Sequence, residues 1–344
     1  MTGDLIVHRA GPGITVQDLG REGCLAHGLS RGGAADPSAL AQGAALLNQA
    51  PSLAALEIAG AGMEVSATRA TWIALTGAPM RAHLADKRLI WNASHCLPPG
   101  ERLRLGPMES GHYAYLHVAG GIDVPMVVGG RGTHLASGIG AALEDGATLP
   151  VGKDPLPDRN PSRLPDDPRF DGGRIRFLEG PQTRLFPDDV LARFLATEFT
   201  RTAWGNRQGV KLGQDGDGFR PQDGLNLLSE VISPGDIQIT GDGTPYVLGP
   251  ECQTIGGYPR IGTVLPQDLP RVMQATSGAP LRFDLVTLEE ALSDYSTPKN
   301  LVPGFRRRIT PLVRNPHDIV DLLSYNFISG VTAGRDLDEE EPRA

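Results

Sequence analysis

Aromatic residues are scarce in this chain of 344 residues: they make up 5% of it, whereas glycine (44) and proline (29) are plentiful. Few large rings and many chain-breaking residues argue against long helices and favour short elements joined by tight turns. Hydrophobic residues still make up 40% of the chain, which is enough to bury a sizeable core. The composition therefore indicates a β-rich protein with two ordinary domains or one large domain.

Cysteine is also rare. Cys24, Cys96 and Cys252 form an odd and sparse set, which fits a reducing compartment better than a disulfide framework. The first twenty residues lack a basic segment followed by an apolar one, so we expect no signal peptide. No apolar run approaches the roughly 20 residues that cross a bilayer. We expect a cytoplasmic protein without membrane segments.

Lysine occurs only four times, and none of Lys87, Lys153, Lys211 and Lys299 ends the G-x-x-x-x-G-K frame of a phosphate loop. None lies between two methionines, as a biotin-carrying lysine would. The formal net charge of -8 argues against nucleic acid or an anionic membrane as the main partner. If the protein uses ATP or biotin, another chain or domain has to bring it.

Motifs for metal binding and for nucleophilic catalysis are weak. The histidines and cysteines form neither a paired CxxC nor an HExxH motif, so we expect no metal site. Residues 28–32, GLSRG, have the G-x-S-x-G spacing of a hydrolase nucleophile elbow, but an elbow needs a helix that begins directly after the serine. Here the helix signal comes later, so we interpret this segment as a glycine-rich loop.

The sequence pattern indicates short strands with a few short helices. A helix is expected at residues 37–48, because Asp36 can cap it and Pro37 suits its first turn. Shorter helices are expected at 188–197 and 287–293, and Gly241-Asp242-Gly243 predicts a hairpin turn. Strand-length apolar runs, typical of antiparallel sheets or barrels, occupy residues 5–8, 14–17, 55–58, 63–65, 71–75, 88–91, 103–105, 113–118, 175–178, 237–240 and 245–248.

A segment rich in proline and aspartate divides the chain. Its Pro-Asp steps cannot hold a ladder or a helix, so we interpret residues 151–172 as a linker or long surface loop. We predict an N-terminal β-rich domain at 1–150 and a C-terminal domain at 173–296. An extension follows at 297–344, with a helical turn at 319–323 and an acidic end that we expect to be disordered.

Four segments together point to a known family: GPGITVQDLGREGCLAHGLSRGGAADPSALAQGAALLNQ, EIAGAGMEV, YLHVAGGIDVPMVVGGRGTHLASGIG and CQTIGGYPRIGTVLPQDLP. In order and spacing, over about residues 5–292, they resemble the allophanate hydrolase subunit 2-like family, also called the biotin-dependent carboxyltransferase family. It includes the C subunit of the ATP-dependent 5-oxoprolinase, the KipA antikinase partner and part of urea carboxylase. The resemblance implies a mainly β fold with two cyclophilin-like β-barrel domains and a few short helices.

The resemblance leaves three functions open. The first is the C-like subunit of a 5-oxoprolinase that hydrolyses 5-oxo-L-proline to L-glutamate with ATP, together with a B-like or KipI-like partner and an A-like partner. The second is carboxyl transfer to urea or a related amide, with biotin supplied by another chain. The third is a non-catalytic KipA-like regulator that binds a KipI-like kinase inhibitor.

The resemblance also implies where a site lies. The family's motifs fall on Gln17-Asp18, Gly20-Arg21, Glu57, Gly120-Gly121, Arg207, Glu230 and residues 253–259, although the run NRQGVKL around Arg207 departs from the S-R-M-G-Y type of many relatives. Lactam hydrolysis and carboxyl transfer both need N–H donors and a cation at an amide or ureido oxygen, and a carboxylate that takes a proton.

We therefore predict catalytic roles for Glu57, Arg207 and Glu230, with either glutamate as the base or as a structural acceptor of turn amides. For substrate binding we predict Arg21, Gln253, Thr254, Gly256, Gly257 and Tyr258. Either Arg21 or Arg207 would pair the substrate carboxylate in bidentate fashion, and the bare backbone of the paired glycines would let a ligand come close.

Overall fold

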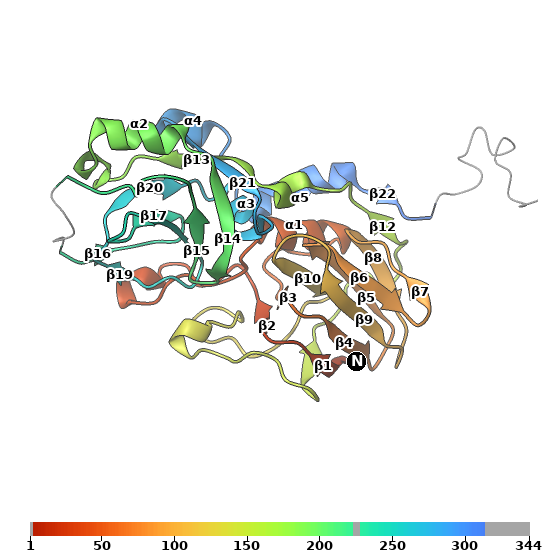
Figure 1. Ribbon diagram of the computed structural model, residues 1–344. Coiled ribbons are helices and arrows are strands. Elements are labelled where there is room, and N and C mark those ends of the chain that lie inside the picture. Colours follow the sequence, from red (N-terminus) through yellow and green to blue (C-terminus); the bar gives the residue numbers. More distant parts are fainter. Residues whose placement is uncertain (1–2, 223–227, 314–344) are drawn as a thin grey trace, which may run out of the picture.

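The computed structural model describes residues 3–222 and 228–313. They form a mainly β protein with two β-rich parts, the N-terminal sheets and a C-terminal barrel (Figure 1). The mainly β class predicted from the composition is confirmed. None of the helices in these residues is long and apolar enough to cross a membrane.

The N-terminal part contains two sheets. The order of the six-stranded sheet is β11 (Thr148–Val151), β1 (Gly3–Ala10), β4 (Met63–Ala67), β9 (Leu103–Met108), β6 (Met80–Leu84) and β7 (Lys87–Arg88). The order of the seven-stranded sheet is β2 (Ile14–Gln17), β3 (Ala55–Ala59), β10 (Tyr113–Val118), β5 (Thr71–Gly77), β8 (Ala93–Leu97), β12 (Ser162–Arg163) and β22 (Thr310–Pro311).

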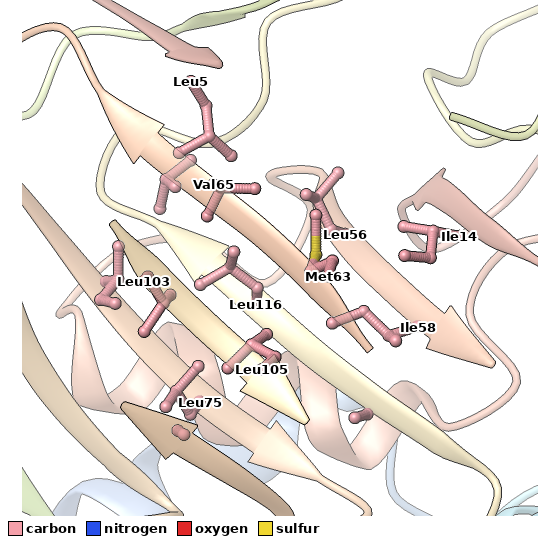
Figure 2. Packing of buried hydrophobic residues seen from close by; sticks show 14 of the residues in the cluster. Leu5, Ile14, Leu56, Ile58, Met63, Val65, Leu75, Leu103, Leu105 and Leu116 are labelled. Carbon is pink, nitrogen blue, oxygen red and sulfur yellow. The ribbon is translucent and has the colours of Figure 1, made fainter. Parts of the chain in front are cut away.

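The two sheets bury one apolar cluster between them. Leu5, Val65 and Leu105 come from the first sheet, and Leu56 and Leu116 come from the second (Figure 2). Each strand alternates buried and outward residues where one of its faces meets solvent, as in β1. Packing of this kind explains why the apolar runs in the sequence are short and separated by turn residues.

The C-terminal part is a closed barrel, in the order β13 (Gly173–Leu178), β20 (Arg260–Val264), β17 (Asp236–Ile239), β18 (Pro245–Leu248), β15 (Gly209–Gly213), β14 (Phe199–Asn206) and β21 (Pro280–Leu285). The parallel pairing of β13 with β21 closes it. The rings of Phe177, Phe194, Phe199, Phe219 and Phe283 fill its interior, with neighbouring centroids 4.9 to 6.2 Å apart. Five of the chain's nine phenylalanines thus lie together here. A separate two-stranded ladder pairs β16 (Glu230–Val231) with β19 (Ile255–Gly256).

The helices are short. They are α1 (Pro37–Leu46), α2 (Asp188–Ala196), α3 (Leu269–Gln274), α4 (Leu288–Ser293) and α5 (Pro298–Arg308), with 3₁₀ turns η1 (Cys24–His27), η2 (Leu135–Ser137), η3 (Pro168–Asp171) and η4 (Thr183–Leu185). The Asp36 side chain accepts a hydrogen bond from the Ala39 amide, so the predicted cap of α1 is confirmed. The helix lies between the N-terminal sheets and the barrel, with α5 against it (Figure 1).

Buried polar contacts join the two parts. Gln274 of α3, which is fully buried, donates to Asp36 Oδ2 at 3.0 Å and to the Tyr113 carbonyl at 2.7 Å. Arg169 pairs with the same Asp36 carboxylate at 2.8 Å. Leu40 of α1 belongs to the same apolar cluster as the phenylalanines of the barrel. The two parts therefore share a continuous core.

The structure differs from the sequence predictions in several places. The described residues form one closed barrel where two were expected, because the N-terminal strands form two sheets around a shared core rather than a single bonded ring. The strand predicted at 88–91 is wrong apart from its first residue. The segment predicted as a linker contains a short ladder, because β12 pairs with β8 and β22. It also contains the 3₁₀ turn η3. Helices α3 and α5 were missed. The helical turn predicted at 319–323 and the acidic end lie outside the described residues.

Candidate functional site

A buried arginine connects the two β-rich parts. Arg207 lies in the turn between β14 and β15, and its guanidinium reaches Glu57 on β3 and Glu251, which follows β18. Arg207 Nε lies 2.6 Å from Glu251 Oε1, and Nη2 donates to the Gly33 carbonyl at 2.6 Å. The exposed fractions of Glu57, Arg207 and Glu251 are 0%, 8% and 2%. The structure thus brings the predicted residues Glu57 and Arg207 together and adds Glu251, which sequence reasoning missed.

Glu57 has partners on both carboxylate oxygens. One oxygen accepts from Arg207, and the other accepts from the Ala35 amide at 2.8 Å and from the Tyr115 hydroxyl at 2.6 Å. Burial, and then the charge of Glu57, raise the pKa of Tyr115 well above its usual value, so this hydroxyl remains a donor. A carboxylate satisfied in this way is typical of a structural ion pair. The predicted role of Glu57 as a base stays a prediction.

His134 extends the cluster. Its Nε2 lies 2.8 Å from the Ser30 hydroxyl, and its Nδ1 lies 4.0 Å from Glu251 Oε2, beyond hydrogen-bond distance. Burial is the main cause that lowers the pKa of His134, and the charge of Glu251 opposes it. Ser30 is buried and lies in a loop with no helix directly after it, so the elbow geometry is absent at this position.

A cavity of about 570 Å³ lies beside this cluster, between the N-terminal sheets and the barrel. Ala59 and Tyr113 form part of its N-terminal wall, and Arg201, Arg207 and Glu251 belong to the opposite side. Glycines on both sides leave bare backbone at the surface of the cavity. The cavity therefore combines guanidinium groups, a carboxylate and exposed peptide groups in a space that suits a small molecule.

Arg21 holds a loop rather than facing this cavity. It is buried, and its guanidinium donates to the carbonyls of Val127 at 3.0 Å and Gly132 at 2.7 Å. The neighbouring Asp18 carboxylate accepts from the amides of Gly20 at 2.9 Å and Arg131 at 2.6 Å. These motif residues fix the loop at 127–132, which leads directly to His134.

Gln17 and the paired glycines also support the backbone. The Gln17 amide group donates to the Thr133 carbonyl at 3.0 Å, next to His134. Gly120 has φ +90°, and a Cβ at this position would lie 2.4 Å from the Gly152 carbonyl oxygen. A residue with a side chain would be strained there, so glycine is required. The family motif at Gly120-Gly121 therefore serves chain packing at this point.

Glu230 and the predicted substrate-binding segment lie on the small ladder of β16 and β19. Glu230 pairs with Arg260 at 2.6 Å and accepts from the Gln182 amide at 2.8 Å. Gln253 and Tyr258 are exposed; Thr254, Gly256 and Gly257 are partly buried, and none of these five lines the cavity beside Arg207. Thr254 approaches the loop before Ser30 through a 3.5 Å contact with the Gly28 carbonyl. The structure thus does not bring Glu230 into hydrogen-bond contact with Glu57 or Arg207.

Sequence reasoning missed Glu251, His134 and Arg201, and the sequence signals that could have identified them differ in strength. Glu251 directly precedes the segment that begins at Cys252, and His134 lies within another segment that carries the resemblance. Their proximity to Arg207 depends on the packing of the barrel against the N-terminal sheets, which no local pattern encodes. Arg201 carried no signal, because an arginine within a strand is usually assigned to a solvent-facing side.

Residues 27–285 match the protein family described as "Carboxyltransferase domain, subdomain A and B", and the chain belongs to this family. This agrees with the family resemblance drawn from the sequence motifs.

Individual proteins of known name or structure are also similar to this chain. The chain is 36% identical to the protein named as the C subunit of 5-oxoprolinase in Escherichia coli over 296 residues, which cover 84% of this chain and 93% of that protein. It is similar to the crystal structure of TTHA0988, with a TM-score of 0.74 and 29% identity over 82% of this chain. It is also similar to the K. lactis urea amidolyase, with a TM-score of 0.77 and 25% identity over 91% of this chain. The chain spans about half of the former structure (56%) and a smaller part of the latter (21%).

Proposed function

We propose that the chain is the C-like subunit of an ATP-dependent 5-oxoprolinase complex, which hydrolyses 5-oxo-L-proline to L-glutamate. The observation that carries this proposal is the 36% identity to a protein named as the C subunit of 5-oxoprolinase, over nearly the full length of that protein. An alignment of this extent covers most of the chain rather than a single motif. The sparse cysteines support a cytoplasmic location for the complex.

The proposed complex contains an A-like partner and a B-like or KipI-like partner. The chain's four lysines lack the phosphate-loop frame, which supports ATP binding by a partner chain. We propose no covalently bound cofactor for this chain.

The substrate is a stable lactam that also carries a carboxylate. In the proposed reaction ATP phosphorylates the oxygen of the lactam amide. Water then adds to the carbon that carries this oxygen. The C–N bond breaks, the ring nitrogen takes up a proton, and a second water releases phosphate from the acyl phosphate. Cationic and N–H donors stabilise the charge that develops on the oxygen. The guanidinium groups and bare peptide groups of the cavity supply donors of this kind.

Coexpression of the chain with its A-like and B-like partners tests the proposal. We expect the three chains to purify together and to release glutamate from 5-oxoproline only when ATP is present. The isolated chain is the control and is expected to be inactive. Glutamate release by the isolated chain with ATP would overturn the model of a shared site.

A second candidate is carboxyl transfer to urea or a related amide, with biotin on another chain. The likeness to the K. lactis urea amidolyase favours it. Avidin distinguishes the two functions, because it sequesters biotin and would abolish carboxyl transfer but leave 5-oxoproline hydrolysis unchanged. Binding of a KipI-like protein without turnover of either substrate would instead support a regulatory role.

A further inference from the structure

Arg201 is a buried cation that lacks an anionic partner. It lies on β14 with 2% of its surface exposed, and it takes part in no ion pair within residues 3–222 and 228–313. Its Nη1 donates to the Thr202 carbonyl at 2.6 Å, and its Nε has no hydrogen-bond partner in the same part of the chain. Burial lowers the pKa of this guanidinium, but arginine stays charged in proteins. An uncompensated buried charge is costly to the fold.

The other arginine of the cavity has opposite surroundings. Arg207 is held between the carboxylates of Glu57 and Glu251, so its charge is already neutralised. Glu251 also lines the cavity, yet no acidic oxygen of the described residues lies within ion-pairing distance of Arg201. Electrostatics alone therefore selects Arg201 over Arg207 as the group that an incoming anion would pair with.

The wall beside Arg201 carries a further polar atom without a partner. His112 and Tyr113 line the same cavity, and His112 Nε2 is buried without a hydrogen-bond partner among the described residues. Burial, then the charge of Arg201, lower the pKa of His112 to about 4, so the ring is neutral near pH 7. A hydrogen bond to the Ala275 backbone already occupies the other ring nitrogen. The free Nε2 of the neutral ring therefore offers its lone pair, which can accept from the N–H of a ligand's amide group.

The backbone beside Arg201 is shaped to admit its guanidinium. Gly205 also lines the cavity, and a Cβ at this position would lie 2.8 Å from Arg201 Nη2. The bare Cα of Gly205 thus leaves room for the guanidinium at the cavity wall. This is a second feature, independent of charge, that fixes Arg201 at the cavity.

We propose that Arg201 binds the carboxylate of a small amide acid in this cavity, and that His112 meets the amide group of the same ligand. The identity of the amide acid as 5-oxoproline rests on the proposed function, whereas the assignment of the anion to Arg201 rests on the geometry alone. Guanidinium groups pair with carboxylates through charge-assisted, often bidentate, hydrogen bonds.

Thermal unfolding of the full chain, with and without ligand, tests the assignment. Arg201→Met removes an unpaired buried charge, so we expect the Tm of the ligand-free chain to stay unchanged or to rise. We expect 5-oxoproline to raise the Tm of the wild type and of Arg282→Gln, an exposed arginine on β21, but not that of Arg201→Met. The probe 2-pyrrolidinone has the same lactam without the carboxylate. Its effect on the Tm should therefore be the same in the wild type, in Arg282→Gln and in Arg201→Met.

Steady-state kinetics of the reconstituted complex provide the second readout. Loss of a charged hydrogen bond to the substrate predicts a rise in KM of about 10- to 100-fold for Arg201→Gln, with a smaller change in kcat. Arg201→Lys, which keeps the charge, should recover part of this loss. Gly205→Ala should raise KM less, because the methyl group displaces the guanidinium without removing it.

The outcomes separate the two proposals. An unchanged KM in Arg201→Gln, in a complex that hydrolyses 5-oxoproline, would overturn the role of Arg201 and leave the proposed function intact. A complex without this turnover, whose chain is still stabilised by simple carboxylates in an Arg201-dependent way, would overturn the function and support the site. A large drop in the ligand-free Tm of Arg201→Met would show that the arginine is structural and would also overturn the assignment.

Discussion

At the scale of single residues, Glu57, Arg207 and Glu251 depend on one another. Removing the arginine would leave two buried carboxylates without their cation, and breaking a buried ion pair costs about 3–5 kcal/mol. We therefore expect Arg207→Met to lower the free energy of unfolding by about this amount, measured by urea denaturation of the isolated chain. Arg282→Met is the control, because its pair with Glu198 is exposed and such pairs contribute about 0–1 kcal/mol. Equal losses in the two variants would contradict the structural role of the cluster.

The pH dependence of stability is a second property of single residues. His117 on β10 is buried and lies 2.8 Å from the Thr76 hydroxyl, and burial lowers its pKa from the ordinary 6.5 to about 3. Below pH 6.5 the unfolded chain therefore binds a proton at this residue that the folded chain does not. The free energy of unfolding should fall as pH decreases from about 6.5 toward 3, by up to about 1.4 kcal/mol per pH unit for this group.

His117→Gln should reduce this slope, and urea denaturation at several pH values measures it. His112 keeps its own contribution in the variant, because its pKa is also lowered, to about 4. A slope that is identical in the wild type and the variant would contradict a neutral, buried His117.

How far the sequence predicts the site also depends on particular residues. Glu57 and Arg207 were chosen through family resemblance, and the structure places them in contact. Glu230 was chosen on the same basis, yet it lies on the ladder of β16 and β19 with Arg260 as its partner. Arg201 could not be chosen, because only tertiary packing distinguishes a buried strand arginine from an exposed one.

At the scale of elements, helix α1 illustrates how packing overrides local propensity. Gly43 lies in the middle of the helix, where alanine would normally be more favourable by about 1 kcal/mol. A Cβ on Gly43, however, would lie 2.4 Å from the ring of His117. We expect Gly43→Ala to destabilise the protein by about 1–3 kcal/mol, as overpacked core positions do, and urea denaturation measures this change.

Helix α5 offers the matched control. A Cβ on Gly304 would meet no atom within 4 Å, so Gly304→Ala should gain stability by up to about 1 kcal/mol. A gain in both variants would contradict the close contact between α1 and β10.

Local signals predicted elements unevenly. The Asp36-Pro37 start of α1 and the Thr287 cap of α4 are strong signals, and both helices are present. Thr297-Pro298 gives α5 the same type of start, but Pro303 and Gly304 inside it obscure the helical pattern. Strand β6 was missed because its apolar residues Met80, Ala82 and Leu84 alternate with polar ones over only five positions.

At the scale of the whole molecule, the cavity exists because two different β structures are fused through one core. Tyr113 and Tyr115 of β10 belong to the same apolar cluster as the barrel phenylalanines, so the N-terminal sheets and the barrel pack as one body at this place. Composition predicted a mainly β protein, but it could not distinguish a closed barrel from two packed sheets, because both use the same short alternating strands. The cyclophilin-like character of the parts and the domain boundaries stay predictions.

The most direct test of the account is 5-oxoproline-stimulated phosphate release from ATP by the purified partners, measured with this chain present and with it omitted. The account predicts stimulation only when the chain is present, and a loss of stimulation at low 5-oxoproline concentration when the chain carries Arg201→Gln. Equal stimulation by the partners without this chain would contradict it.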